Sequence, residues 1–159
     1  MTGGERVFQP DVTVATIVID GGRLLMVEED VAGRVVINQP AGHLEPGESI
    51  VDAAIRETLE ETGWDVRPRA FVGAYRWTAP SVSLGGEERT YVRFAFLAEP
   101  LQHDPRRPLD HGIVRAVWMT PAELQAEYPR HRSPLVWRVA ADALAGRRFP
   151  LDVVQSLGG

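Results

Sequence analysis

Residues 42–64 read GHLEPGESIVDAAIRETLEETGW, and this stretch decides how the rest of the chain is interpreted. Ser49 is a residue type that caps helix N-termini, and Asp52, three residues later, suits the free N–H groups of a first turn. Gly63 readily adopts the left-handed conformation that follows a last helical turn. We therefore expect a helix over Ile50–Thr62.

Three glutamates of this helix share one patch, because a helix advances about 100° per residue and Glu57, Glu60 and Glu61 stand at i, i+3 and i+4. The other side is expected to pack on a sheet through Val51, Ile55, Leu59 and Thr62. Like charges this close destabilise a helix. Mg²⁺ or Mn²⁺ would compensate them, and Arg56 is expected to pair with Glu60 or Glu48. A solvated acidic face with internal ion pairs explains the same pattern without a metal.

The spacing of these residues resembles the signature of the Nudix hydrolase family. That signature runs Gly, five residues, Glu, seven residues, Arg-Glu, an apolar position, any residue, Glu-Glu, any residue, Gly and an apolar residue. Its fixed positions are filled here by Gly42, Glu48, Arg56, Glu57, Glu60, Glu61 and Gly63. Trp64 fills the last apolar position, whereas Thr58 departs from the first one. The resemblance implies the Nudix fold and a hydrolase that acts on phosphorus-containing anhydrides.

The resemblance also implies a metal site and a mechanism. One or more Mg²⁺ ions, with Mn²⁺ as a substitute, would be held by the Gly42 carbonyl and by Glu57, Glu60 and Glu61. Arg56 and Glu48 would position these ligands. The metal would neutralise the charge of a diphosphate, orient its phosphorus for in-line attack and lower the pKa of a bound water. A non-catalytic nucleotide-binding module of this fold would normally have lost metal ligands, and this chain keeps each glutamate of the signature.

Segments outside the signature resemble one bacterial phosphatase of the same family, in the same order along the chain. They are DVTVA at 11–15, NQPAGHLE at 38–45, RFAFLAE at 93–99, RSPLV at 132–136 and RFPL at 148–151. This likeness implies hydrolysis of nucleoside di- and triphosphates with release of phosphate, and of hydroxymethylpyrimidine diphosphate. The alternative within the family is cleavage of ADP-ribose or another dinucleotide-type pyrophosphate into two monophosphates.

Four residues are candidates for binding this small organic diphosphate. Trp77 is able to stack on a planar base, although an aromatic residue of a strand is more often part of a core. Asn38 and Gln39 are able to bond a base edge or to satisfy loop backbone. Arg132 precedes Ser-Pro at an expected helix start, where it either meets a phosphate or lies on the surface.

The general base is left open by the sequence. The loop before the last expected strand offers Asp104, Asp110 and His111, and none of them matches a fixed spacing. His111 would titrate near neutrality, but a loop histidine is more often a solvated side chain. Glu60 or Glu61 of the signature itself is the alternative.

The rest of the chain predicts an α+β fold, an α/β/α sandwich with a mixed sheet between helices. A tail is expected at residues 1–9 and loops at 39–48 and around Gly85-Gly86. The expected strands cover 11–19, 23–28, 34–38, 70–77, 90–98 and 113–119. Thr120 and Pro121 begin a short helix that Pro129 ends, and a last helix is expected from Pro134 to about Ala145.

Composition limits the remaining possibilities. The 159 residues suit one domain over 1–159, and a net charge of −5 argues against a general nucleic-acid binder. With no cysteine, a metal must be held by oxygen or imidazole ligands. All 17 basic residues are arginine, which suits phosphate recognition but equally reflects genome composition. Without an apolar run or a signal peptide we expect a cytoplasmic protein with no membrane contact, either monomer or homodimer.

Overall fold

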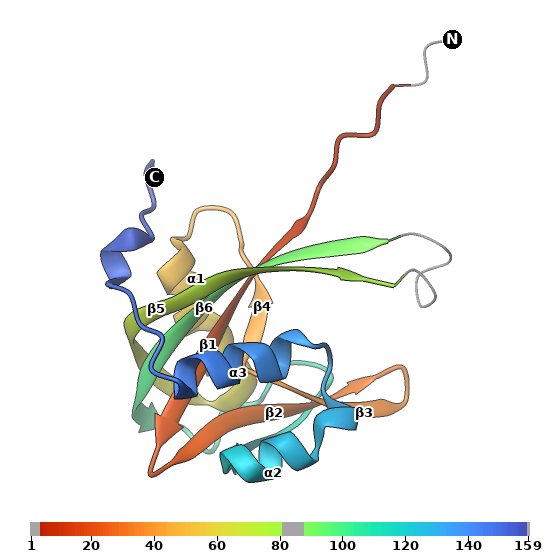
Figure 1. The fold of residues 1–159 in the computed structure, drawn as a ribbon. Helices are drawn as coiled ribbons and strands as arrows, with labels where there is room; N and C mark the ends of the chain where they lie inside the picture. The colour runs from red at the N-terminus through yellow and green to blue at the C-terminus, as the bar shows by residue number, and fades with distance from the viewer. Residues whose placement is uncertain (1–3, 81–87, 159) are drawn as a thin grey trace.

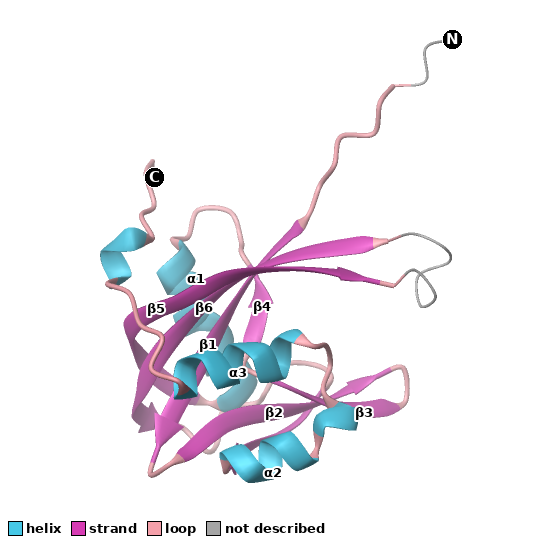
Figure 2. Cartoon of the chain, in the orientation of Figure 1, coloured by secondary structure: helices cyan, strands magenta, loops and turns pink. Residues whose placement is uncertain are grey.

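The computed structural model describes residues 4–80 and 88–158 (Figure 1). Its strands are β1 (Asp11–Asp20), β2 (Arg23–Val31), β3 (Arg34–Asn38), β4 (Ala41–His43), β5 (Trp64–Ala79), β6 (Arg89–His103) and β7 (Ile113–Met119). Its helices are α1 (Ile50–Thr62), α2 (Pro121–Ala126) and α3 (Leu135–Leu144), with 3₁₀ turns at Tyr128–Arg130 and Leu151–Val153 (Figure 2).

The sheet is mixed, as predicted. Its strand order is β3-β2-β1-β6-β5, with β4 paired to β1 and β7 paired to β2. Strands β1 and β6 run parallel from Asp11↔Tyr91 to Val18↔Ala98, whereas the other pairs are antiparallel. The ribbon of β5 and β6 extends beyond its neighbours, above the β2–β3 hairpin in Figure 1.

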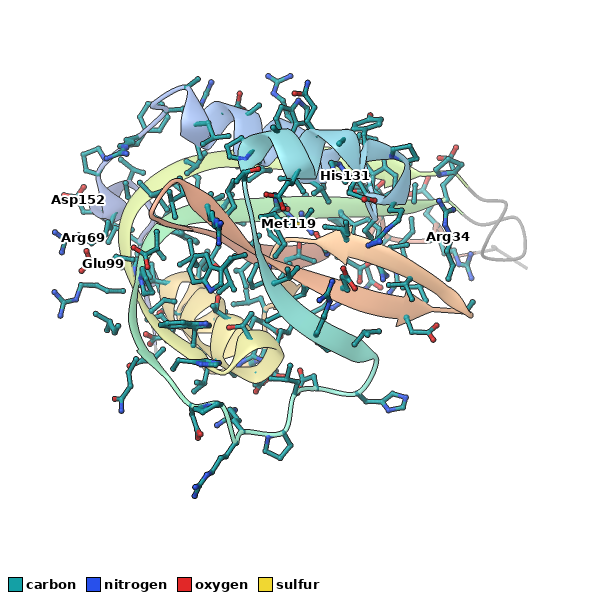
Figure 3. All side chains as sticks on the ribbon, turned by 90° about the horizontal axis from the view of Figure 1, so that it is seen from below. Arg34, Arg69, Glu99, Met119, His131 and Asp152 are labelled. Carbon is teal, nitrogen blue, oxygen red and sulfur yellow. The ribbon has the colours of Figure 1, made fainter. Side chains whose placement is uncertain are left out.

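Strand β1 lies at the centre and sends alternate side chains to opposite faces of the sheet. Val14 packs in a cluster with Ala53 and Ala54 of α1. Ile17 packs in another cluster with Val136 and Val139 of α3 and neighbouring residues. Figures 1 and 3 show the two helices on opposite sides of the strands. The α+β prediction, with the sheet between helices, is therefore confirmed.

Helix α1 has the bounds that its caps predicted. The Ser49 hydroxyl accepts the Asp52 N–H at 3.0 Å, and Gly63 ends the helix with a φ of 74° and an N–H bond to the Leu59 carbonyl. The left-handed φ explains why a glycine stands at position 63. The short helix after Thr120 is also present, and the Thr120 hydroxyl accepts the Glu123 N–H.

The buried face of α1 differs from the prediction. The expected core residues Val51, Ile55 and Leu59 are only half-buried. The buried residues are Ala53, Ala54, Glu57, Thr58, Glu61 and Thr62. The physical reason is size, because the sheet approaches the helix along its two alanines, and this contact turns two of the carboxylates inward. Apolar periodicity alone pointed to the larger side chains.

A second difference concerns the segment 39–48, which the sequence predicted to be a loop throughout. Ala41–His43 instead forms β4, which pairs with β1 from Thr13↔His43 to Ala15↔Ala41. A three-residue strand between Pro40 and a turn that contains Pro46 and Gly47 carries no periodic signal, so the composition of the segment did not reveal it. The strand matters because it brings Gly42 against α1.

Strands β5 and β6 are longer at both ends than the sequence predicted, since their backbones pair from Trp64↔His103 to Ala79↔Arg89. The expected tail is exposed over residues 4–9, and the rest of it, like the Gly85-Gly86 loop, lies outside the described residues. After α3 the chain returns to the sheet, where Phe149 bonds to Phe71. Among the described residues, no helix is long and apolar enough to cross a membrane.

Candidate active site

Arg56 organises the polar end of α1. Its guanidinium binds Glu48 through two hydrogen bonds of 2.8 and 2.9 Å, in the planar geometry that arginine gives to a carboxylate. It also donates to Glu57 at 2.8 Å and Glu60 at 3.1 Å, and to the His43 carbonyl at 3.0 Å. Both partners expected for Arg56 therefore contact it. These bonds hold the pKa of Glu48 below its usual range.

One carboxylate from a distant loop joins two from the helix. Glu57, Glu60 and Asp110 each place an oxygen within 4.8 Å of the others, and we call these three residues the acidic cluster. Asp110 is held there because its N–H bonds to the Glu60 carbonyl at 3.0 Å. The loop is fixed further by the bond from the Asp30 N–H to the Gly112 carbonyl at 2.8 Å. Sequence reasoning named Asp110 only as a candidate base, because no spacing linked it to the helix.

Burial dominates the electrostatics of the cluster. It raises the pKa of Glu57 to about 7, against the lowering effect of Arg56 and with a further rise from the charges of Glu60 and Asp110. It raises the pKa of Glu61 to about 9, opposed by a hydrogen bond from the Ala41 N–H at 2.8 Å. Ionisation of these two carboxyl groups is therefore disfavoured in the metal-free site, and a bound cation would favour their charged forms.

The structure brings most of the predicted residues of the signature together around Arg56, which contacts Glu48, Glu57 and Glu60. Glu61 instead accepts the Ala41 N–H and is not part of the acidic cluster. His111 is exposed. Asp104 is also exposed, and its carboxylate accepts the N–H of Arg106.

The donor set of this region fits a hard divalent cation. Its ligand atoms are carboxylate oxygens, the type that Mg²⁺ and Mn²⁺ accept. Gly42 supplies a second observation, because a Cβ at this position would overlap the Glu57 carboxyl group. The glycine of the signature therefore leaves room for the Glu57 side chain.

Thr58, the departure from the family signature, is fully buried on the core face of α1. Its hydroxyl bonds to the Ala54 carbonyl at 2.7 Å and to the hydroxyl of Thr16 on β1 at 2.7 Å. The polar atom is therefore satisfied, and an apolar contact has been replaced by a hydrogen bond between helix and sheet.

A cavity of about 510 Å³ lies between the β2–β3 hairpin, the ends of β5 and β6, and the start of α3. We call it the arginine cavity. Its lining includes Arg34, Arg89, Arg93, Arg132, Trp77 and Tyr91. The Trp77 and Tyr91 rings stack on each other with centroids 5.9 Å apart. Two of the predicted substrate residues, Trp77 and Arg132, thus line one cavity.

The other two candidates lie behind its wall. Gln39 is 1% exposed and donates to the Val136 carbonyl at 2.6 Å, while its oxygen accepts from Arg93 at 3.3 Å. Asn38 is also buried and donates to Glu29 at 3.3 Å. Glu29 in turn pairs with Arg132 at 3.3 Å. Sequence reasoning missed Arg93 and Glu29, because single charged residues in strands carry no motif.

The acidic cluster and the arginine cavity are neighbours in electrostatic terms. The charges of Glu29 and Glu61 both raise the pKa of Arg93, although burial, the largest effect, lowers it to about 10. Glu29 and Asp110 both raise the pKa of Glu61. Glu61 therefore interacts electrostatically with Asp110 of the acidic cluster and with Arg93 of the arginine cavity.

Comparisons with known proteins agree with this geometry. Phosphatase NudJ of Escherichia coli (strain K12) is 40% identical over 148 residues, which cover 92% of this chain and 92% of that protein. A NUDIX hydrolase from Nitrosomonas europaea superposes with a TM-score of 0.87 at 45% identity, covering 94% of this chain and 98% of the other. An ADP-ribose pyrophosphatase from Streptococcus suis gives a TM-score of 0.63 at 16% identity, over 86% of this chain and 92% of the other, which concerns the fold alone.

The family is settled by a match along the chain itself. A model of the NUDIX domain matches residues 9–137, from the start of the sheet into α3. This stretch contains the signature, the acidic cluster and the residues named for the arginine cavity. The chain therefore belongs to the Nudix family of hydrolases, which act on phosphoanhydrides.

Proposed function

We propose that this chain is a Mg²⁺-dependent hydrolase that releases inorganic phosphate from nucleoside di- and triphosphates, with hydroxymethylpyrimidine diphosphate as a further substrate. The observation that carries the proposal is the gathering of Glu57, Glu60 and Asp110 within 4.8 Å, beside a cavity lined by arginines and aromatic rings. The likeness to phosphatase NudJ supports the same choice of substrates.

The residues of the acidic cluster would hold the ion. Arg56 keeps Glu57 and Glu60 in place through its hydrogen bonds, and the backbone bond to Glu60 does the same for Asp110. When bound, Mg²⁺ would neutralise charge on the diphosphate and make a water more acidic. The Gly42 carbonyl remains a proposed further ligand.

We assign the proton acceptor to Glu61, whose ionised form a cation in the acidic cluster would favour. Its Oε1 is occupied by the Ala41 N–H, so Oε2 is the oxygen that would take the proton from the attacking water. Glu60 and Asp110 belong to the acidic cluster, and His111 is exposed, so these alternatives fit the acceptor less well. As the bond from water to the terminal phosphorus forms, the bond from this phosphorus to the bridging oxygen breaks, and the bridging oxygen leaves with the nucleotide that has one phosphate fewer.

A substrate panel tests the proposal. Pure protein with Mg²⁺ is incubated separately with GDP, GTP, hydroxymethylpyrimidine diphosphate and ADP-ribose at matched concentrations. Released phosphate is measured beside chromatography of the nucleotides. The Glu57→Gln variant, purified in parallel, controls for contaminating phosphatases.

We expect GDP to give GMP and phosphate with a higher kcat/KM than that of ADP-ribose cleavage. A dinucleotide-type substrate would need contacts for its distant half in order to raise its turnover. If ADP-ribose gave AMP with the higher kcat/KM, the substrate assignment would be wrong and the ADP-ribose alternative would replace it. If no compound were cleaved, the chain would act as a non-catalytic nucleotide-binding module.

Three further predictions about the protein as a whole belong to this proposal. Residues 1–159 are proposed to form one domain, which limited proteolysis would test. The protein is proposed to be cytoplasmic, which cell fractionation would test. Sedimentation would distinguish a monomer from a homodimer, the two states that the sequence allows.

A further inference from the structure

We infer that Arg93 is the residue that binds the phosphate next to the organic group of the substrate, and that Trp77 with Tyr91 receives the organic group itself. This inference rests on the proposed function, since it assigns parts of a nucleotide to parts of the same site. It concerns a residue outside the family signature.

Arg93 lies on β6 and lines the arginine cavity, yet it is only 7% exposed. Its NH1 donates to the side-chain oxygens of Asn38 at 3.5 Å and Gln39 at 3.3 Å. Both acceptors are neutral. Its Nε is buried and has no hydrogen-bond partner among the described residues. A buried donor on a charged group is costly when unpartnered, so an anion in the cavity would stabilise it.

The other arginines of the cavity are already engaged. Arg89 pairs with Asp11 at 2.6 Å, and Arg132 pairs with Glu29 at 3.3 Å. Arg34 is exposed and donates to the Pro129 carbonyl at 2.8 Å. Arg93 is therefore the cavity arginine that donates to neutral side-chain acceptors and keeps a buried N–H donor without a partner among the described residues.

The place of Arg93 also suits a phosphate at the boundary of the two regions. Arg93 donates to Gln39, two residues before Ala41, and the Ala41 N–H binds Glu61, which follows Glu60 of the acidic cluster on α1. A phosphate bound by Arg93 would thus have the cluster on one side. On its other side the half-buried rings of Trp77 and Tyr91 offer apolar surface to a planar group.

Binding measurements on the whole protein without metal test this assignment separately from turnover. In excess EDTA, the affinities for GMP, ribose 5-phosphate and guanosine are measured by calorimetry. The variants are Arg93→Gln, Arg93→Lys and Trp77→Leu. The control is Arg69→Gln, which removes an exposed arginine that pairs with Glu99 on a distant part of the molecule (Figure 3).

We expect Arg93→Gln to weaken GMP and ribose 5-phosphate by about 10–100-fold, the loss of one charge-assisted hydrogen bond, and to leave guanosine unchanged. Arg93→Lys should restore only part of the affinity, because lysine lacks the planar fork. Trp77→Leu should weaken GMP and guanosine but not ribose 5-phosphate. Arg69→Gln should change none of them.

Folding is monitored in the same samples. If Arg93 serves binding, the Tm of Arg93→Gln should be no lower than that of the wild type, since a buried charge is removed.

The inference is overturned if wild-type protein binds no GMP, if Arg93→Gln binds GMP as wild type does, or if Arg93→Gln loses affinity for guanosine as much as for GMP. Arg93-dependent GMP binding without any Mg²⁺-dependent hydrolysis would overturn the proposed function and leave this inference standing.

Discussion

The acidic cluster and the arginine cavity are built from the same chemistry with opposite signs. In the first region Arg56 is shared by Glu48, Glu57 and Glu60, so negative charge is in excess. In the second, four arginines line the cavity, and among the described residues Arg93 donates only to neutral side-chain oxygens, so positive charge is in excess. A buried charge without a partner of opposite sign lowers the stability of the folded state. This imbalance is the basis for the proposal that ligands of opposite sign, a divalent cation and a phosphate, complete the two regions.

The largest effect is expected from removing a charge of the acidic cluster. Glu57→Gln or Glu60→Gln should lower kcat by more than about a hundredfold, the scale seen when one group that stabilises charge in a transition state is lost. The change retains volume, so the fold should survive. The matched control is Asp52→Asn, an exposed acid in the first turn of the same helix. Comparable turnover in Glu57→Gln and Asp52→Asn would contradict the cluster's role.

Removing the Arg56 guanidinium should lower both the activity and the stability of the protein. Arg56→Gln leaves half-buried and buried carboxylates without their shared donor, and we expect a loss of about 1–3 kcal/mol in the free energy of unfolding. Arg56→Lys should recover little, because one ammonium does not reproduce the bonds to Glu48 and Glu60. Urea unfolding in EDTA measures the effect, and an unchanged midpoint for Arg56→Gln would argue against it.

The Glu61 assignment separates binding from chemistry. If Glu61 takes the proton, Glu61→Gln should lower kcat about 10²–10⁴-fold while the Mg²⁺ concentration that gives half-maximal rate stays near that of wild type. If Glu61 is instead a ligand, as the family resemblance implies, that concentration should rise. A Mg²⁺ titration of initial rates at saturating GDP distinguishes the two.

The excess of negative charge predicts how stability depends on pH in metal-free protein. The ordinary pKa of both glutamates is 4.5, and burial raises it to about 7 for Glu57 and about 9 for Glu61. Between these values the folded state holds more protons than the unfolded state, so stability should fall as pH rises from about 4.5 towards 9. Melting scans in EDTA should show this decline, and Glu57→Gln or Glu61→Gln should flatten it. A Tm that rose over this range would refute the explanation.

The smallest effect is expected at the edge of the arginine cavity. Arg132 is partly exposed and already paired with Glu29, so Arg132→Gln should raise the KM for GDP by only about 2–5-fold and leave kcat unchanged. Steady-state kinetics beside Arg93→Gln would sharpen the contrast between an engaged arginine and a buried one. An Arg132→Gln effect larger than that of Arg93→Gln would reverse the assignment.

Helix α1 was predictable to the residue because its two ends carry local chemistry, the Ser49 cap and the left-handed Gly63. Its buried face was not, since Ala53 and Ala54 have little hydrophobic weight and only the packed sheet reveals that they form the contact. Strand β4 escaped prediction because its three residues exist as a strand only through their pairing with β1.

The same distinction holds for the site. The family signature identified Arg56 and its contacts because their spacing is short and helical. Asp110 joins the acidic cluster through a backbone hydrogen bond to Glu60, which is distant in the sequence. Arg93 differs from the other arginines of the cavity because the folded chain buries it. Long-range pairing and desolvation are properties of the folded chain, so neither leaves a local pattern in the sequence.

The most direct test of the central claim is the rate of phosphate release from GDP as a function of free Mg²⁺, set with EDTA after tightly bound metal has been removed. The account predicts no turnover in excess EDTA, a saturable rise with Mg²⁺ in the wild type, partial replacement by Mn²⁺, and no such rise in Glu57→Gln. Full turnover of wild-type protein in excess EDTA would contradict a metal held by the acidic cluster as the basis of catalysis.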